Sequence, residues 1–270
     1  MLTWRRRKPV KRIGLALGGG GAKGLSHIAF LKALDELGVR PAVIAGSSIG
    51  AVIGGLYAGG VSGAGLEQML QSLGFMELSK IVLDFSILSN SAIFTGNRVE
   101  EFLARRLPAL TFEEVEIPLK IVATDFWNRR EVVFASGSLI TAIRASMAMP
   151  AVFEPVLFND MVLIDGGAVN PLPYDLLRQE CDLTIAIDVS GEKTYASKDP
   201  VPNMVESILS TFQIMQASIV ECKKRVSPPD IYVKPALTNI RVLDFYRYKE
   251  ILAGVQEEVQ EFKETLKNLI

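Results

Sequence analysis

The sequence predicts an α/β domain whose central sheet is mainly parallel. Three apolar runs, residues 13–17 (IGLAL), 118–124 (PLKIVAT) and 183–189 (LTIAIDV), have the length and boundaries of buried strands. The last run is apolar at almost every position, as in a parallel strand that helices cover on both faces. Segments with helical spacing separate the three runs. The 270 residues, 49% hydrophobic and 22% charged, are enough for one sizeable domain.

The remaining elements follow from periodicity and from turn residues. A basic tail is expected at 1–12 and a single domain at 13–270. Helices are predicted over 26–37, after the strand 42–45, over 66–73, 97–107, 138–147, between Pro202 and Pro228, and as one closing helix over 244–269. Hairpins are predicted over 118–134 and 156–164, and a last strand over 231–233. The helix after Pro202 is expected to carry a stripe of Val205, Ile208, Leu209, Phe212 and Met215.

The glycine-rich loop that follows the first strand predicts an anion site. In such a loop the backbone N–H groups and the positive end of the following helix converge. The loop does not match a P-loop, because Lys23 follows alanine and precedes glycine. A dinucleotide fingerprint fits Gly19, Gly21 and Gly24, but the next strand ends in Gly-Ser-Ser instead of the acidic residue that holds a ribose. The third interpretation is an oxyanion hole formed by the N–H groups of Gly19, Gly20 and Gly21, and the rest of the sequence favours it.

The next motif predicts a nucleophilic serine. Residues 42–50 read AVIAGSSIG, a strand that runs into Gly-x-Ser-x-Gly and then into a helix rich in small residues. Gly46 and Gly50 at the two ends let Ser48 occupy a strained turn with its hydroxyl directed into a cleft. Ser48 is therefore the candidate nucleophile.

A serine nucleophile needs a base, and the histidine content limits the choice. The single histidine, His27, precedes Ser48, whereas an α/β-hydrolase has the order Ser, acid, His. We expect His27 to be a helix residue satisfied by a neighbour. The alternative base is Asp165, which a short apolar strand delivers into the turn Gly166-Gly167. Burial would raise the pKa of this carboxyl group and make it a better base than an aspartate in water.

These motifs, in this order, resemble those of the patatin-like phospholipases. The resemblance rests on GGGAKG at 19–24, GSSIG at 46–50, DGG at 165–167 and the segment ASMAMPAVF at 145–153, and it covers about residues 12–189. The C-terminal helices, 200–270, lie outside it. The resemblance implies a three-layer α/β/α patatin-like fold with a mainly parallel central sheet, related to that of cytosolic phospholipase A2.

The resemblance also implies a set of roles. Ser48 would be the nucleophile, Asp165 the base, and the N–H groups around Gly20 and Gly21 the oxyanion donors. Lys23 stands at the family's Arg/Lys position, where it would steady the loop or meet a phosphate, and we favour the first. The implied activity is hydrolysis of acyl esters in lipids or phospholipids. A poorly active or non-catalytic acyl-binding regulatory protein and an acyltransferase are the alternatives.

Composition limits which classes of partner and cofactor are expected. The formal net charge of -1 and the lack of a basic nucleic-acid motif argue against nucleic-acid binding. Cys181 and Cys222 form no Cys-x-x-Cys motif or Cys/His cluster, so we expect no metal, no other cofactor and no disulfide framework, and a reduced, cytoplasmic setting.

Three segments bear on membrane contact. The uncharged segment 41–66 is rich in glycine and predicts a buried helix instead of a transmembrane span. The basic tail with Arg5, Arg6, Arg7 and Lys8 is expected to be solvated, or else to touch anionic lipid at the inner membrane surface. The apolar segment 75–94 is interpreted as a lid or binding loop, or as a satellite core.

Overall fold

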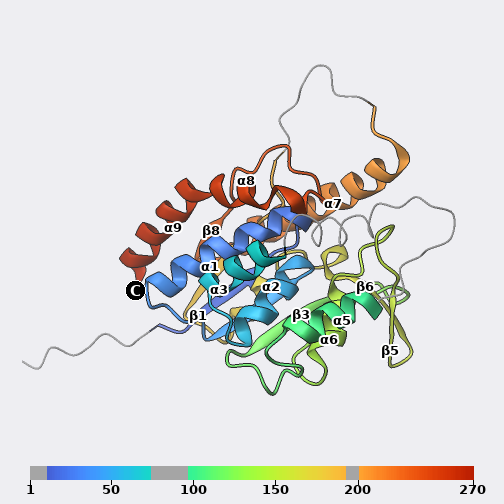
Figure 1. The fold of residues 1–270 in the computed structure, drawn as a ribbon, viewed down its shortest axis with the longest axis horizontal. Helices are drawn as coiled ribbons and strands as arrows, with labels where there is room; N and C mark the ends of the chain where they lie inside the picture. Colours follow the sequence, from blue (N-terminus) through green and yellow to red (C-terminus); the bar gives the residue numbers. More distant parts are fainter. Residues whose placement is uncertain (1–10, 74–96, 193–200) are drawn as a thin grey trace, which may run out of the picture.

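The computed structural model describes residues 11–73, 97–192 and 201–270, and Figure 1 shows their arrangement. The strands are β1 (Ile13–Leu17), β2 (Val43–Ser47), β3 (Leu119–Asp125), β4 (Arg130–Phe134), β5 (Val156–Phe158), β6 (Met161–Asp165), β7 (Leu183–Ile187) and β8 (Ile231–Val233). The α-helices are α1 (His27–Glu36), α2 (Ile49–Ala58), α3 (Gly63–Ser72), α5 (Asn97–Arg106), α6 (Leu139–Ser146), α7 (Met204–Val226), α8 (Tyr248–Ala253) and α9 (Gln256–Leu269). Short 3-10 helices are η1 (Gly21–Ser26), η2 (Gly166–Ala168), η3 (Tyr174–Leu177) and η4 (Phe245–Arg247).

The strands form one sheet in the order β5-β6-β3-β2-β1-β7-β8, with β4 paired to β3. The pairs β3–β2, β2–β1, β1–β7 and β7–β8 are parallel, whereas β3–β4, β3–β6 and β5–β6 are antiparallel. The parallel core brings the carboxyl ends of β1 and β2 to the same edge, which is where ligands bind in open α/β sheets. The predicted mainly parallel sheet is confirmed.

Helical elements cover both faces of the sheet. Side chains alternate along β1, so Leu15 and Leu17 join the larger core with α1, α2, α3, α6 and α9. Ala16 points the other way, into a smaller core with Tyr174 of η3 and Val220 of α7. These are the three layers that the family resemblance implied. The fold class is therefore confirmed.

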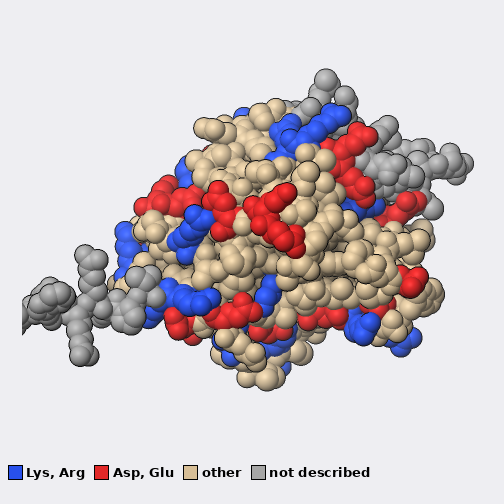
Figure 2. Space-filling model, turned by 90° about the horizontal axis from the view of Figure 1, so that it is seen from below, with Lys and Arg blue, Asp and Glu red and all other residues tan. Residues whose placement is uncertain are grey.

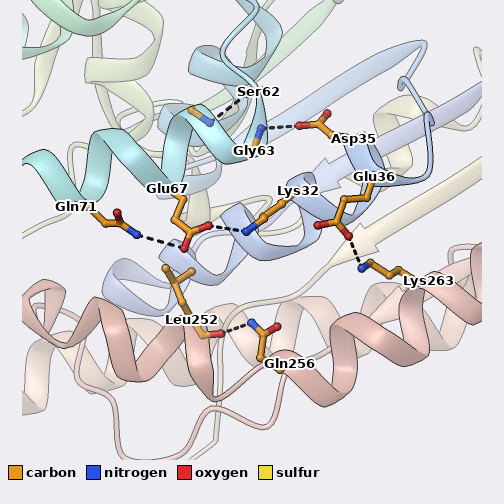
Figure 3. A network of polar contacts seen from close by, with 11 residues as sticks. Lys32, Asp35, Glu36, Ser62, Gly63, Glu67, Gln71, Leu252, Gln256 and Lys263 are labelled. Atoms are coloured by element: carbon orange, nitrogen blue, oxygen red, sulfur yellow. Dashed lines mark hydrogen bonds and ion pairs between the residues drawn. The ribbon is translucent and has the colours of Figure 1, made fainter.

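Polar contacts join three of the helices on one side of the sheet (Figure 3). Lys32 of α1 forms an ion pair with Glu67 of α3 over 3.0 Å, and Asp35 accepts a hydrogen bond from the N–H of Gly63 over 2.6 Å. Lys263 of α9 pairs with Glu36 of α1. On the face in Figure 2, basic and acidic side chains are interspersed without a large area of one sign.

Two predictions about helices are corrected. The single closing helix over 244–269 is wrong, because glycine at position 254 ends α8 and the chain resumes as α9. The break lets α8 pack against η1 while α9 packs against α1, where Phe262 meets Phe30 edge to face at 5.6 Å. On α7, the predicted stripe is wrong at two of its five residues, because Ile208 and Met215 are 44% and 55% exposed.

The segments relevant to membrane contact stand as follows. Among the described ranges, no single helix is long and apolar enough to cross a bilayer. Helices α2 and α3 meet the length and composition criteria only as a pair, and the two are bent by 119°. The basic tail with Arg5, Arg6, Arg7 and Lys8 and the whole of the apolar segment 75–94 lie outside the described residues.

Candidate active site

Ser48 occupies the turn between β2 and α2. Its backbone has φ 55° and ψ -124°, a conformation that is strained for a residue with a side chain. The flanking glycines are required by close approach. A β-carbon on Gly46 would lie 2.6 Å from the carbonyl oxygen of Gly50, and one on Gly50 would lie 2.1 Å from that of Leu17. This is the backbone geometry expected of a nucleophile elbow, and the role of Ser48 as the nucleophile stays a prediction.

The hydroxyl of Ser48 donates a hydrogen bond to a carboxylate oxygen of Asp165 over 2.7 Å. The second oxygen of Asp165 accepts from the N–H of Gly167, also over 2.7 Å. Asp165 is fully buried, and this burial raises the pKa of its carboxyl group to about 6 although both hydrogen bonds act in the opposite direction. A carboxylate with this pKa is ionised at neutral pH and still accepts a proton readily.

The pairing of β3 explains how two residues 117 positions apart meet. Strand β2 pairs with β3 up to Ser47 opposite Val122, and β6 pairs with β3 up to Asp165 opposite Ala123. Because β4 occupies the other side of β3, β2 and β6 lie on the same side and run toward each other. The serine and the aspartate thus stand where the two strand ends converge.

The glycine loop lies beside Ser48. A β-carbon on Gly19 would lie 3.3 Å from that of Ser48, and one on Gly20 would lie 2.3 Å from the carbonyl oxygen of Val189. Gly21 has φ 59°, the left-handed region that favours glycine. This close packing leaves no room for side chains along the loop.

One of the three predicted oxyanion donors is corrected. The N–H of Gly19 donates to the carbonyl of Pro171 over 2.9 Å, so it is committed within the protein. Gly20 and Gly21 stand at the start of η1, where the first N–H groups have no acceptor inside the helix. In the described part of the chain their N–H groups also have no backbone acceptor in a neighbouring turn or loop. These two amides remain the candidate donors.

His27 serves the backbone of the glycine loop. Its Nε2–H donates to the carbonyl of Gly18 over 2.9 Å, and the residue is fully buried. Desolvation lowers the pKa of the imidazole to about 4, so the ring is neutral at pH 7. Among the described residues, Nδ1 has no hydrogen-bond partner. The contact of Nε2 with a neighbouring carbonyl agrees with the helix residue expected from the sequence, and the partner is the loop instead of Ser48.

Lys23 also points into the protein. Its ammonium donates to the carbonyl of Ile240 over 3.3 Å, and its stem packs against Gly191. Burial lowers the pKa of Lys23 to about 8, while Asp188 and Asp244 act in the opposite direction. These contacts tie the glycine loop to the C-terminal part of the chain. The last glycine of the motif, Gly24, packs against the side chain of Ile49.

Two residues near the site were not found from the sequence. The hydroxyl of Ser146, at the end of α6, accepts a hydrogen bond from the N–H of Ser48 over 2.9 Å. Gln216 of α7 is 5% exposed, and its Nε2 lies 1.8 Å from where a β-carbon of Gly167 would be and 3.8 Å from that of Gly19. The amide of Gln216 thus lies between the aspartate turn and the glycine loop. The one sequence signal for this residue is that it is a polar residue among the apolar residues of α7.

No metal site accompanies these groups in the described ranges, where no three His, Cys, Asp or Glu side chains are placed to hold an ion. The arrangement supplies a strained serine, a buried carboxylate in direct contact with it, and two backbone amides beside it. Such a set can transfer an acyl group through a covalent serine ester.

Comparison with known proteins gives a consistent picture. The family model described as patatin-like phospholipase matches residues 15–178. An uncharacterized NTE family protein of Mycobacterium tuberculosis is 36% identical over 74% of this chain and 55% of its own length. The lysophospholipase NTE1 of Kluyveromyces lactis is 28% identical over 88% of this chain and 18% of its own length. The chain therefore spans about half, or less, of these relatives.

Among solved structures, VipD from Legionella pneumophila is similar with a TM-score of 0.49 and 14% identity. The similarity covers 96% of this chain and 72% of that chain.

Proposed function

This chain belongs to the patatin-like phospholipase family, and we propose that it hydrolyses lipid acyl esters with Ser48 and Asp165 as a catalytic dyad. The observation that carries the proposal is the 2.7 Å hydrogen bond from the Ser48 hydroxyl to the buried carboxylate. Serine hydrolases commonly place a histidine at that point. Here the carboxylate of Asp165 takes the place of the histidine beside the serine hydroxyl, and His27 is hydrogen-bonded to the carbonyl of Gly18.

In the first half of the reaction, Asp165 takes the proton of Ser48 as the serine oxygen attacks the ester carbonyl carbon. The carbonyl oxygen becomes an oxyanion and accepts hydrogen bonds from the N–H groups of Gly20 and Gly21. When the tetrahedral intermediate collapses, the carbon–oxygen bond to the alcohol breaks and Asp165 returns its proton to the departing oxygen. The fatty acyl group then remains on Ser48 as an ester.

In the second half, Asp165 takes a proton from water and the hydroxide attacks the acyl-enzyme. Collapse releases the fatty acid, and the proton returns to the serine oxygen. Each oxyanion donor of this kind typically contributes about 10²- to 10³-fold in rate. The loop can supply such donors only if the substrate approaches the backbone closely, which agrees with glycine at 20 and 21.

The proposed substrate class is a lipid with an accessible acyl ester. A relative of this chain bears the name lysophospholipase, so a lysophospholipid is the first substrate to test. The test compares fatty acid release from lysophosphatidylcholine by the wild type, Ser48→Ala and Asp165→Asn. We expect release only by the wild type. Added glycerol distinguishes hydrolysis from acyl transfer, because a transferase would yield a glyceride in place of free acid.

Ser47→Ala is the matched control. Ser47 is the neighbouring serine, it is fully buried, and its hydroxyl has no hydrogen-bond partner among the described residues. Removing this hydroxyl should leave turnover intact. Equal fatty acid release by the wild type and Ser48→Ala would refute the proposed function.

A further inference from the structure

Strands β2 and β6, which carry Ser47 and Asp165 at their ends, both pair with β3, and β3 continues beyond these two ends. Ala123 lies opposite Asp165, and β3 runs on to Asp125, which pairs with Leu163. The next residue, Phe126, donates its N–H to the carbonyl of Val162 over 2.8 Å. At about 3.3 Å per residue, the turn between β3 and β4 lies roughly 10 Å beyond the level of Asp165. In Figure 1, β5 and β6 lie toward the right, away from α9 and the C-terminus.

This turn presents aromatic side chains to solvent. Trp127 is 73% exposed and Phe126 is 45% exposed, and the two rings meet edge to face at 4.8 Å. In the adjacent hairpin, Leu157 is 80% exposed and pairs with Val162, the residue that binds Phe126. Large apolar side chains exposed together on neighbouring strands mark an interaction site more often than scattered ones do.

The turn holds its shape through polar contacts. The side-chain amide of Asn128 donates to Asp125 over 2.7 Å, and the N–H of Asn128 donates to the other carboxylate oxygen over 3.3 Å. The guanidinium of Arg130 lies 3.4 Å from the same aspartate. Asp125 is thereby neutralised. Arg129 is exposed and forms no ion pair with any residue that the structure describes, so the turn 126–129 carries one positive charge.

Exposed aromatic rings beside a free arginine suit one kind of partner in particular. Tryptophan and phenylalanine partition into the boundary between headgroups and acyl chains, and arginine keeps its charge at the headgroup level. Each basic side chain near an anionic lipid surface adds further attraction. Aromatic and arginine side chains are also enriched at protein interfaces, and a bilayer is the favoured partner here because, if the proposed function holds, the substrate of this sheet edge is a lipid.

We propose that the turn 126–129 docks this protein on an anionic phospholipid bilayer. Phe126 and Trp127 enter the interface and Arg129 contacts an anionic headgroup. Docking in this way turns the sheet edge that bears Ser48 and Asp165 toward the lipid. The proposal does not require turnover, because binding can be measured with Ser48→Ala. The docking segment is distinct from the basic tail at 1–12.

The test uses Trp127 as its own reporter. The chain has two tryptophans, so Trp4→Phe leaves Trp127 as the single tryptophan of the full-length protein, and excitation at the red edge of the tryptophan band avoids the tyrosines. Vesicles of phosphatidylcholine with phosphatidylglycerol are added to this variant in the Ser48→Ala background. We expect the emission of Trp127 to shift to the blue on binding. Vesicles of phosphatidylcholine alone should give a smaller shift at the same lipid concentration.

Sedimentation with the same vesicles then measures affinity. Replacing Trp127 by alanine should lower the partition coefficient about tenfold or more, because fully burying an exposed side chain of this size is worth about 1.5–3 kcal/mol. Phe126→Ala should lower it about threefold or more, because Phe126 is only 45% exposed before binding. Arg129→Gln should lower it about fivefold on anionic vesicles only. Val226→Ala is the matched control, because Val226 is 87% exposed at the C-terminal end of α7, outside the turn. All four side chains are exposed, so unfolding should not complicate the comparison.

Two results would overturn the proposal. Vesicle binding without a shift in Trp127 emission, and unaffected by Trp127→Ala, would assign binding to another surface such as the basic tail. Self-association without vesicles that Trp127→Ala abolishes would assign the aromatic turn to a second copy of the chain. If the wild type released no fatty acid, the proposed function would be refuted, but the vesicle-binding result would still stand.

Discussion

Asp165→Asn should make this protein more stable at pH 8 while abolishing its activity. Burial raises the pKa of Asp165 from 3.8 to about 6 in the folded protein. A shift of this size corresponds to roughly 3 kcal/mol of unfolding free energy. The folded state binds more protons than the unfolded state between about pH 4 and 6, so wild-type stability falls as the pH rises through that window. Asparagine carries no charge at any of these pH values, so the Asp165→Asn variant does not lose unfolding free energy as the pH rises.

The replacement keeps both hydrogen-bond partners of the side chain. The oxygen of asparagine can still accept from the N–H of Gly167, and its amide can donate to the hydroxyl of Ser48. The full difference corresponds to an increase in Tm of about 5 °C for a chain of this length. The hydrogen bonds to Ser48 and Gly167 are weaker for a neutral amide than for a carboxylate, and this will reduce the increase in Tm.

Thermal and urea unfolding at pH 4, 5, 6, 7 and 8 measure this effect. The advantage of Asp165→Asn should be near zero at pH 4, grow up to about pH 6, and remain constant above it. Asp160→Asn is the matched control, because Asp160 is an exposed carboxylate in the hairpin turn that leads into β6. An Asp165→Asn variant that is less stable than the wild type at pH 8, or a difference independent of pH, would refute the reasoning.

Three other predictions test the site. In the proposed mechanism Asp165 acts in its ionised form, so kcat/KM should rise about tenfold per pH unit below pH 6 and level off above it, and a flat profile would exclude this base. Ser146→Ala leaves the N–H of Ser48 buried without its acceptor, which should cost about 1–3 kcal/mol of stability and lower kcat, as melting and turnover assays will show. Gln216→Leu removes the amide beside the dyad turn and should lower kcat more than it changes KM or Tm, and unchanged kcat would exclude the amide from the site.

Much of the fold and the central groups followed from local patterns. The strand before the glycine loop and the strand before Ser48 are short apolar runs with glycine boundaries, and these have the same bounds, or nearly so, in the structure. The close approaches around Gly46 and Gly50 explain why the elbow leaves so clear a motif in the sequence. Such motifs can be recognised in a sequence because only glycine fits the backbone at these positions.

The contacts that were missed depend on tertiary structure. Ser146 meets Ser48 across 98 positions, and although Ser146 lies in the segment 145–153 that carries the resemblance, no local pattern indicates its contact with Ser48. The amide of Gly19 is bound by the carbonyl of Pro171, a contact between two irregular segments. On α7, apolar residues occur on both faces, so periodicity did not show which face is inward. Packing against the aspartate turn decided that, and it placed Gln216 at the site.

The most direct test of the central claim is the rate at which a fluorophosphonate labels Ser48 at pH 8, with the adduct located by mass spectrometry. The comparison is between the wild type, Asp165→Asn and His27→Gln, which removes the imidazole but keeps an N–H donor for Gly18. If the carboxylate alone activates the serine, His27→Gln should label within a few fold of the wild type and Asp165→Asn at least about 100-fold more slowly. Wild-type labelling of Asp165→Asn, or lost labelling in a folded His27→Gln, would contradict the account.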